Sequence, residues 1–433
     1  MIVVSARVPD TGVRRLAATL YGYTFLTDLV LLYPVYALLF SDTGLSIAEI
    51  STLFVIWSTA SILLEVPSGA WADAVSRRLL LCLAPLLAGA GYALWVVVPS
   101  YPAFAVGFVL WGAAGALSSG ALEALVFTEL DRLGAAGRYA RTMGRARTAG
   151  VLGVLASVGL AGPVLAVGGY PAVGAASVLT SLLAAAVATR LPEHRGPSAP
   201  ADLPVPAGSP GASGSPVVAG STADDGDDLG WLASLGAGLA EARADPRVRA
   251  AVLLVPAVTA IWGALEEYTP LLARDTGVPG STVPLLLLLI SAGVTLGGLL
   301  APAGERLVSR GYAVLLGAAA LALAVGAGLR HPVGFALLGV AFCALQLATV
   351  LADARLQARI TGPGRATVTS VAGMATGLAI IAVYGGYALV AGAAGNAVAF
   401  VAAAVPYLGL ALWLLIRRPP APARRAAPVG VDG

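Results

Sequence analysis

Three acidic side chains in the long apolar stretches of this chain stand out as carboxyl groups that could do chemistry. Asp28 has apolar neighbours for more than two helical turns on both sides, and Glu266 and Glu267 lie near the end of another apolar stretch. A charged side chain at the centre of a membrane helix costs roughly 2.5–3.5 kcal/mol, so it must face a partner or an aqueous cavity, or be protonated. These residues are therefore candidates for binding a proton or a solute, with Asp28 first. The alternative for Asp28 is a neutral carboxyl group hydrogen-bonded to a neighbouring helix.

Glu266 and Glu267 are adjacent, and adjacent helical side chains point about 100° apart. At most one of them is therefore expected to face a cavity well. Gln346 is a further candidate, because a buried amide needs hydrogen-bond partners; it either lines a cavity or bonds to a neighbouring helix. Aromatic residues at similar depth are further candidates for lining the cavity, although packing against lipid is the simpler explanation for most of them. These are Tyr33, Tyr36, Trp57, Trp111, Trp262 and Tyr384.

Residue types that build enzyme active sites are scarce. The only histidines, His194 and His331, lie at the edges of polar connections, so neither a histidine-based triad nor a histidine-rich metal site is expected. A glycine-rich phosphate-binding loop needs a lysine, and the chain contains none. We therefore expect neither an enzyme nor a cofactor, a bound metal ion or a nucleic-acid partner.

The elements that carry the candidate residues are predicted to be membrane-spanning helices. Of the 433 residues, 58% are hydrophobic and only 11% are charged, with a mean hydropathy of +0.86. Twelve apolar stretches are near or above the roughly 20 residues that a spanning helix needs, and they lack the alternation of a membrane barrel. These stretches cover approximately residues 16–40, 47–69, 79–98, 102–127, 145–168, 171–190, 249–273, 282–303, 312–329, 332–356, 367–391 and 396–416.

The arginines predict the orientation of these spans. All 26 basic residues are arginine, and only Arg274 and Arg330 fall in the short connections that alternate with arginine-rich ones. Basic residues accumulate in cytoplasmic loops. We therefore expect a multi-pass protein of the bacterial inner membrane, with both termini and the long central connection in the cytoplasm.

Composition divides the chain into two similar halves. A connection rich in Pro, Gly, Ser and Asp predicts disorder, interrupted by a short amphipathic helix near residues 229–243. The halves are weakly similar, as in Val75-Ser76-Arg77 and Val308-Ser309-Arg310, which is typical of transporters built from repeats. The expected regions are an N-terminal six-helix bundle (1–190), a cytoplasmic linker (191–246), a C-terminal six-helix bundle (247–417) and a cytoplasmic tail (418–433).

Gly69–Arg78 is a short polar stretch that predicts a loop between the second and third spans. It resembles the signature of the major facilitator superfamily, which reads roughly Gly-x-x-x-Asp-Arg-x-Gly-Arg-Arg. Gly69, Asp73, Arg77 and Arg78 match that pattern, whereas Ala74 and Ser76 depart from it. The resemblance extends over both halves. It implies an all-α membrane protein with twelve helices in two six-helix bundles related by a pseudo-two-fold axis.

The resemblance also implies that this stretch belongs to a gate. Asp73 would face the second half, and Arg77 would pair with an acid at the end of span four, either Glu129 or Asp131. Anchoring of Arg77 and Arg78 at lipid headgroups is the alternative. We favour a gate, because a buried charge without a partner is costly.

Two further acids lie toward the same ends of their spans as the gate motif. Glu65 and Glu123 are both at a depth where they can pair with an arginine at the start of span five, Arg145 or Arg147. We expect these pairs to be structural.

The function expected from these features is secondary transport by alternating access. We hypothesise a monomer in the lipid bilayer that is coupled to protons and moves a small, neutral or cationic, partly apolar solute, with export favoured. Two alternatives stay open, namely a metabolite uptake symporter and a non-transporting sensor built on the same scaffold. Drug–proton antiporters of the family usually carry an arginine within span four, and Phe108–Leu117 has none.

Overall fold

The computed structural model describes residues 10–194, 246–360 and 365–416, and the regular structure within these ranges is helical. The predicted all-α fold is confirmed. The predicted amphipathic helix near residues 229–243 and the tail over 418–433 lie outside the described residues. The side chains of residues 65–74 also lie outside them, so the roles expected of Glu65 and Asp73 stay predictions.

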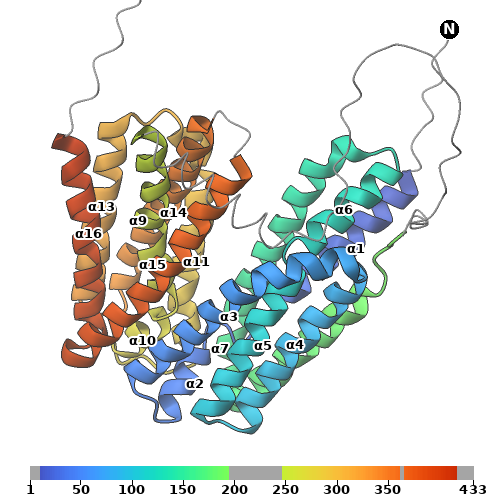
Figure 1. The fold of residues 1–433 in the computed structure, drawn as a ribbon. Helices are drawn as coiled ribbons and strands as arrows, with labels where there is room; N and C mark the ends of the chain where they lie inside the picture. Colours follow the sequence, from blue (N-terminus) through green and yellow to red (C-terminus); the bar gives the residue numbers. More distant parts are fainter. Residues whose placement is uncertain (1–9, 195–245, 361–364, 417–433) are drawn as a thin grey trace, which may run out of the picture.

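The N-terminal half is one group of packed helices (Figure 1). Its helices are long because the apolar stretches of the sequence are long, and a membrane helix satisfies its backbone hydrogen bonds within itself. In chain order they are α1 (Asp10–Asp28), α2 (Tyr36–Asp42), α3 (Ile47–Ala74), α4 (Arg77–Val97), α5 (Tyr101–Ser118), α6 (Ala121–Arg132), the short 3₁₀ helix η1 (Ala136–Arg138) and α7 (Tyr139–Ala188).

The C-terminal half is a second group of helices beside the first (Figure 1). Small residues let its helices approach closely: a Cβ added at Gly293 of α11 would collide with the backbone of Gly339 in α14. The helices of this half are α9 (Pro246–Glu266), α10 (Thr269–Arg274), α11 (Val283–Leu299), α12 (Ala301–Gly304), α13 (Ser309–Gly328), α14 (Gly334–Arg359), α15 (Arg365–Ala394) and α16 (Asn396–Ile416).

The helices account for the twelve predicted spans. Nine helices of the described chain are long and apolar enough to cross a membrane. One of them, α7, joins two helices at Gly169, whose φ of 63° and ψ of −166° interrupt the helical backbone. The predicted spans 145–168 and 171–190 lie on either side of this glycine. The pair α1 and α2 and the shorter apolar helix α11 supply the remaining two crossings.

Spans one, four and seven are broken, whereas the sequence predicts continuous helices. Span one divides into α1 and α2, and Pro34 precedes the second helix; proline disfavours a helical conformation in the residue before it. Span four divides at Gly120, whose φ of 71° suits glycine. Span seven divides after Glu266, and Pro270 lies in the first turn of α10. The breaks lie in sequence that stays apolar, so hydropathy does not reveal them.

The polar stretch between spans two and three is mostly helical, which corrects the predicted loop. Helix α3 continues to Ala74 and α4 begins at Arg77, so only Val75 and Ser76 connect them. The Ser76 hydroxyl accepts a hydrogen bond from the backbone N–H of Leu79 (3.1 Å), as an N-cap serine does. The paired arginines therefore belong to the first turn of a helix.

An aromatic cluster forms the core of the N-terminal half. The ring of Tyr36 lies 5.5 Å from Phe40, 5.9 Å from Phe54 and 5.8 Å from Trp95, measured between centroids. Aromatic pairs at such distances contribute about 0.5–1.5 kcal/mol each beyond their buried area. Tyr36, Trp262 and Tyr384 are buried inside the protein, so the expectation of packing against lipid is wrong for these three.

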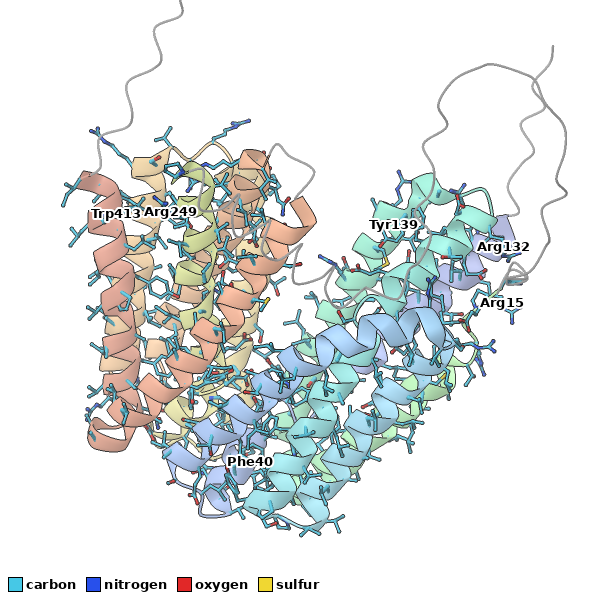
Figure 2. All side chains as sticks on the ribbon, in the orientation of Figure 1. Arg15, Phe40, Arg132, Tyr139, Arg249 and Trp413 are labelled. Carbon is cyan, nitrogen blue, oxygen red and sulfur yellow. The ribbon has the colours of Figure 1, made fainter. Side chains whose placement is uncertain are left out.

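The two halves are bonded to each other at one face of the molecule. We call the face where α1 begins and α16 ends the terminal face (upper in Figure 1), and the opposite one the far face. In Figure 2, Arg15, Arg132 and Arg249 lie toward the terminal face and Phe40 toward the far face. At the far face Arg274 donates to both carboxylate oxygens of Asp42, at 2.5 and 2.9 Å.

Two further bonds reinforce the closure of the far face. The Tyr170 hydroxyl donates to Asp42 Oδ2 at 2.5 Å, and the Tyr268 hydroxyl of the C-terminal half donates to Ser51 of the N-terminal half at 2.7 Å. Burial lowers the pKa of Arg274, but its hydrogen bonds with the carboxylate of Asp42 outweigh that effect, and the pKa is raised above its usual value. The arginine therefore stays charged, and the halves are joined by an ion pair.

Candidate functional site

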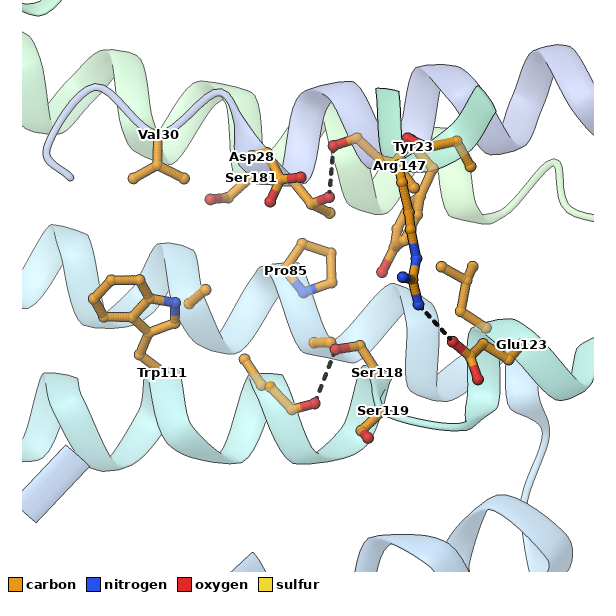
Figure 3. Close-up of a pocket in the computed structure, with 18 of the residues that line it drawn as sticks. Tyr23, Asp28, Val30, Pro85, Trp111, Ser118, Ser119, Glu123, Arg147 and Ser181 are labelled. Carbon is orange, nitrogen blue, oxygen red and sulfur yellow. Dashed lines mark hydrogen bonds and ion pairs between the residues drawn. The ribbon is translucent and has the colours of Figure 1, made fainter. Parts of the chain in front are cut away.

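A cavity of about 470 Å³ lies inside the N-terminal half, between α1, α4, α5, α6 and α7 (Figure 3). Its volume is typical of sites for small molecules. Small residues of α4 and α5 leave the space, and polar and aromatic side chains project into it. These polar and aromatic lining residues are Tyr23, Thr24, Thr27, Asp28, Tyr92, Trp111, Ser118, Ser119, Glu123, Arg147 and Ser181.

Asp28 is the last residue of α1, and not the middle of a continuous helix as the sequence predicts. Its side chain is exposed and lines the cavity. Helix α7 makes room for it with glycines: a Cβ added at Gly150 would collide with Asp28 Oδ2, and one at Gly153 would lie 2.5 Å from the carbonyl oxygen of Phe25. The carboxyl group is thus held between the end of α1 and a glycine face of α7.

The arrangement around Asp28 is suited to a positively charged guest. A helix carries partial negative charge at its C-terminal end, and Asp28 adds a carboxyl group at the end of α1. In Figure 3, Trp111 lies at one end of the cavity and Asp28 nearer its middle. The rings of Trp111 and Tyr92 are 5.7 Å apart, and such aromatic faces attract cations.

An ion pair lies at the other end of the cavity. Glu123 Oε1 lies 3.8 Å from an Arg147 guanidinium nitrogen (Figure 3), and their side chains are 55% and 81% exposed. Arg147 is one of the two partners expected for Glu123; Arg145, the other, is exposed. An exposed pair is screened by solvent and contributes about 0–1 kcal/mol. It can therefore open at little cost.

Arg77 of the gate motif bonds to two other parts of the N-terminal half. Arg77 donates from its guanidinium to the Thr128 hydroxyl (3.1 Å) and from its backbone N–H to Glu193 Oε1 (2.8 Å). Arg78 is exposed in the same helical turn. Arg77 thus links α4 to Thr128 of α6 and to Glu193 after span six.

Glu129 is 1% exposed and serves another pair of residues. Its carboxylate accepts from the backbone N–H of His194 (2.7 Å) and from Nε of Arg132 (3.1 Å). Asp131, the other expected partner of Arg77, is exposed. Glu129 therefore fastens the residues that follow span six to α6, and the pairing of Arg77 with Glu129 or Asp131 stays a prediction.

Sequence reasoning missed several residues of these sites. Glu193 and His194 were assigned to the start of the linker, although they bond to α4 and α6. The only signal was that an acid follows span six on the arginine-rich side of the topology. Tyr23, Tyr92 and Ser181 of the cavity carry no signal, because tyrosine and serine are ordinary residues in membrane helices.

Glu266 and Glu267 line a second cavity of about 30 Å³, which lies between the halves. Helix α9 ends at Glu266, so the regular rotation of 100° per residue ends between the two glutamates. Gln346 lies where α14 crosses α11, and its Cβ would be 3.0 Å from a Cβ added at Gly297. Which of its two predicted environments the amide takes stays a prediction.

Solved structures of transporters share this fold. The nucleoside transporter NupG is 12% identical, with a TM-score of 0.70 over 92% of this chain and 98% of that one. A bacterial homologue of the human lysosomal transporter Spinster, in an inward-facing and unoccupied conformation, is 16% identical, with a TM-score of 0.67 over 94% and 97%. A D-xylose–proton symporter is 15% identical, with a TM-score of 0.61 over 95% and 98%. At these identities the likeness shows the fold alone.

Sequence comparison assigns the family. No curated protein sequence gives a significant match. The family model described as Major Facilitator Superfamily matches residues 19–362. That match covers more than half of the chain, includes the signature at Gly69–Arg78 and agrees with the twelve crossings. The chain belongs to the major facilitator superfamily.

Proposed function

We propose that this protein is a proton-coupled secondary transporter of the bacterial inner membrane, with cytoplasmic termini, that exports a small, partly apolar solute by alternating access. Family membership and fold support a transporter in place of an enzyme. The observation that carries the finer proposal is the carboxyl group of Asp28 in the cavity at the end of α1. Ionisable groups inside membrane helices commonly mark proton or substrate pathways.

The lining of the cavity favours a cationic solute over a neutral one. Thr24 donates its hydroxyl hydrogen to the carbonyl of Ala146 (3.0 Å), Thr27 to that of Thr24 (3.0 Å) and Ser118 to that of Gly115 (3.0 Å). Their oxygen lone pairs are therefore the groups left for a ligand, and lone pairs accept from donors such as an ammonium group.

Competition for one carboxyl group supplies the coupling. A proton and a cationic solute cannot both neutralise Asp28 at once, so binding of the solute releases the proton and binding of the proton releases the solute. Exchange at a site that alternates between the two faces moves them in opposite directions. Inward flow of protons then drives the solute out of the cell. A solute–proton symporter, in which both bind together, is the alternative.

The test begins with a thermal-shift screen of the purified protein against a solute library at two pH values. The solute that binds is then followed in proteoliposomes with a pH gradient of either sign. Asp28→Asn should abolish the dependence of flux on the gradient while the protein still inserts, whereas Glu305→Gln, an exposed acid on the terminal face, should keep it. If the flux of Asp28→Asn still depended on the pH gradient, the assignment of Asp28 as the coupling residue would be wrong. A sensor would bind the solute without counterflow, and a symporter would reverse the effect of the gradient.

A further inference from the structure

The small cavity between the halves is built from both of them. Its volume of about 30 Å³ suffices for one water molecule or one small ion. Glu267, which lines it, is only 7% exposed. The lining residues that could contact such a guest through oxygen atoms include Tyr33 and Tyr36 of the N-terminal half and Glu266, Glu267 and Ser291 of the C-terminal half.

The two carboxyl groups have no counter-charge. Within the described chain neither Glu266 nor Glu267 makes a hydrogen bond or an ion pair through its carboxylate, and the lining contains neither arginine nor histidine. Arg274, on the next helix, is engaged by Asp42. An unpaired buried charge costs several kcal/mol. Two such charges side by side require neutralisation by a guest.

A buried hydroxyl in the same lining is also without a partner. Tyr36 is 2% exposed, and its hydroxyl has no hydrogen-bond partner among the described residues. A buried polar group left unsatisfied costs about 1–3 kcal/mol. A guest that brings a positive charge and contacts the Tyr36 oxygen satisfies the hydroxyl and the carboxyl groups together.

We propose that this cavity binds one small monovalent cation, a sodium ion or a proton, while the far face is closed. The site is separate from the Asp28 cavity and goes beyond the proposed function. Oxygen atoms of Glu266, Glu267, Tyr36 and Ser291 would be the ligands, and the C-terminal end of α9 supplies further partial negative charge. Half-helix ends of this kind coordinate sodium ions or protons in transporters with broken helices.

Binding at this place is coupled to the conformation of the halves. Separation at the far face would divide the ligands, because Tyr36 belongs to one half and Glu267 to the other. The cation therefore stabilises the closed far face by its difference in affinity for the two states. The other titratable groups that face the carboxyl groups are tyrosines, Tyr33, Tyr268 and Tyr384, which are neutral near pH 7.

The experiment measures the thermal unfolding midpoint, Tm, of the purified full chain in detergent. Sodium chloride is titrated against choline chloride at constant ionic strength and fixed alkaline pH, and pH is then varied in choline chloride alone. A rise of Tm with sodium identifies a sodium ion, and a rise only with falling pH identifies a proton. Glu267→Gln should reduce the rise, whereas Glu305→Gln, the control, should retain it in full.

A second variant guards against a folding defect. Tyr36→Phe keeps the ring in its aromatic cluster and deletes only the hydroxyl, so the rise of Tm should shift to higher cation concentration without being lost. The proposal is overturned if wild-type protein and Glu267→Gln respond alike to both titrations. It is also overturned if Tyr36→Phe leaves the cation concentration at the midpoint unchanged.

Discussion

At the level of single residues, the glycine at position 150 determines whether α1 and α7 can hold Asp28 in the cavity. A Cβ added there would overlap with Asp28 Oδ2, whereas one added at Gly159 of the same helix meets nothing within 4 Å. Both substitutions by alanine should favour the isolated helix by up to about 1 kcal/mol. Any difference between the two variants therefore reports the contact with α1.

We predict that Gly150→Ala lowers Tm relative to Gly159→Ala and impairs transport driven by the pH gradient. Overpacking at a helix contact costs about 1–3 kcal/mol, and the methyl group displaces the carboxyl group from its position. Tm of the purified variants and solute flux in proteoliposomes are the measurements. Equal values for both variants would show that α1 moves aside freely and that the position of Asp28 is not fixed by α7.

Sequence reasoning found Asp28 because an acid in an apolar stretch violates the pattern around it. It did not find Gly150, because the chain has 53 glycines and only the crossing of α1 and α7 selects this one. It placed Asp28 inside a continuous helix, because residues 29–33 are as apolar as the rest of the span and Pro34 is the one local signal of a break. A charged residue can be identified from one position of the sequence, whereas the helices that pack around it cannot.

At the level of elements, the first turn of α4 combines two arginines with a helix N-terminus, where positive charge is unfavourable. A carboxylate from a distant part of the chain offsets this. Glu193 accepts from the backbone N–H of Arg77 (2.8 Å) and from the Ser76 hydroxyl. Ser76 stands where the family signature has glycine, so this bond depends on a departure from the signature.

We predict that Ser76→Ala and Glu193→Ala each destabilise the protein by about 1 kcal/mol, and that the double variant loses less than the sum of both. Non-additivity is the mark of residues that share an interaction. The measurement is the free energy of unfolding in a denaturing detergent, with Glu305→Ala as the control for removal of a terminal-face acid. Strict additivity would mean that Glu193 and Ser76 act independently.

The spans themselves were predictable, because twelve apolar stretches of sufficient length are difficult to accommodate except as membrane-spanning helices. The repeat was also informative: Val75-Ser76-Arg77 precedes α4, and Val308-Ser309-Arg310 marks the start of α13, which is the corresponding helix of the second half. The breaks at residues 29–35, 119–120 and 267–268 were missed. A break depends on whether a few backbone groups find partners in neighbouring helices, and hydropathy carries no information about that.

At the scale of the whole molecule, the sequence predicted two halves but not the face at which they meet. Tyr268 and Ser51 bond across the halves although they are 217 positions apart, and no local pattern connects them. In the alternating-access cycle that we propose, the halves rock between two states, and the same sequence must support both closures. Which of the two faces is closed therefore depends on the conformation that the protein adopts, and the sequence does not determine it.

The pair of Asp42 and Arg274 is the most direct electrostatic link between the halves. Its geometry is bidentate, with side chains that are 45% and 29% exposed. Partial exposure limits the contribution of such a pair to about 1 kcal/mol or less. A contribution of this size is small for stability, but it changes a balance between two conformations by about fivefold.

We predict that Asp42→Asn shifts the protein toward opening of the far face. The measurement is the rate at which a membrane-impermeant thiol reagent labels Ser51→Cys, with Cys82 and Cys343 replaced by alanine. Ser51 is 2% exposed and becomes accessible when the halves separate. The labelling rate should rise by up to about fivefold.

Asp275→Asn is the matched control, because Asp275 accepts from Asn396 within its own half (2.9 Å). The charge swap of Asp42→Arg with Arg274→Asp should return the rate toward the starting value, because it restores an ion pair across the halves. Equal labelling rates in Asp42→Asn and Asp275→Asn would mean that the Asp42–Arg274 pair does not hold the far face closed.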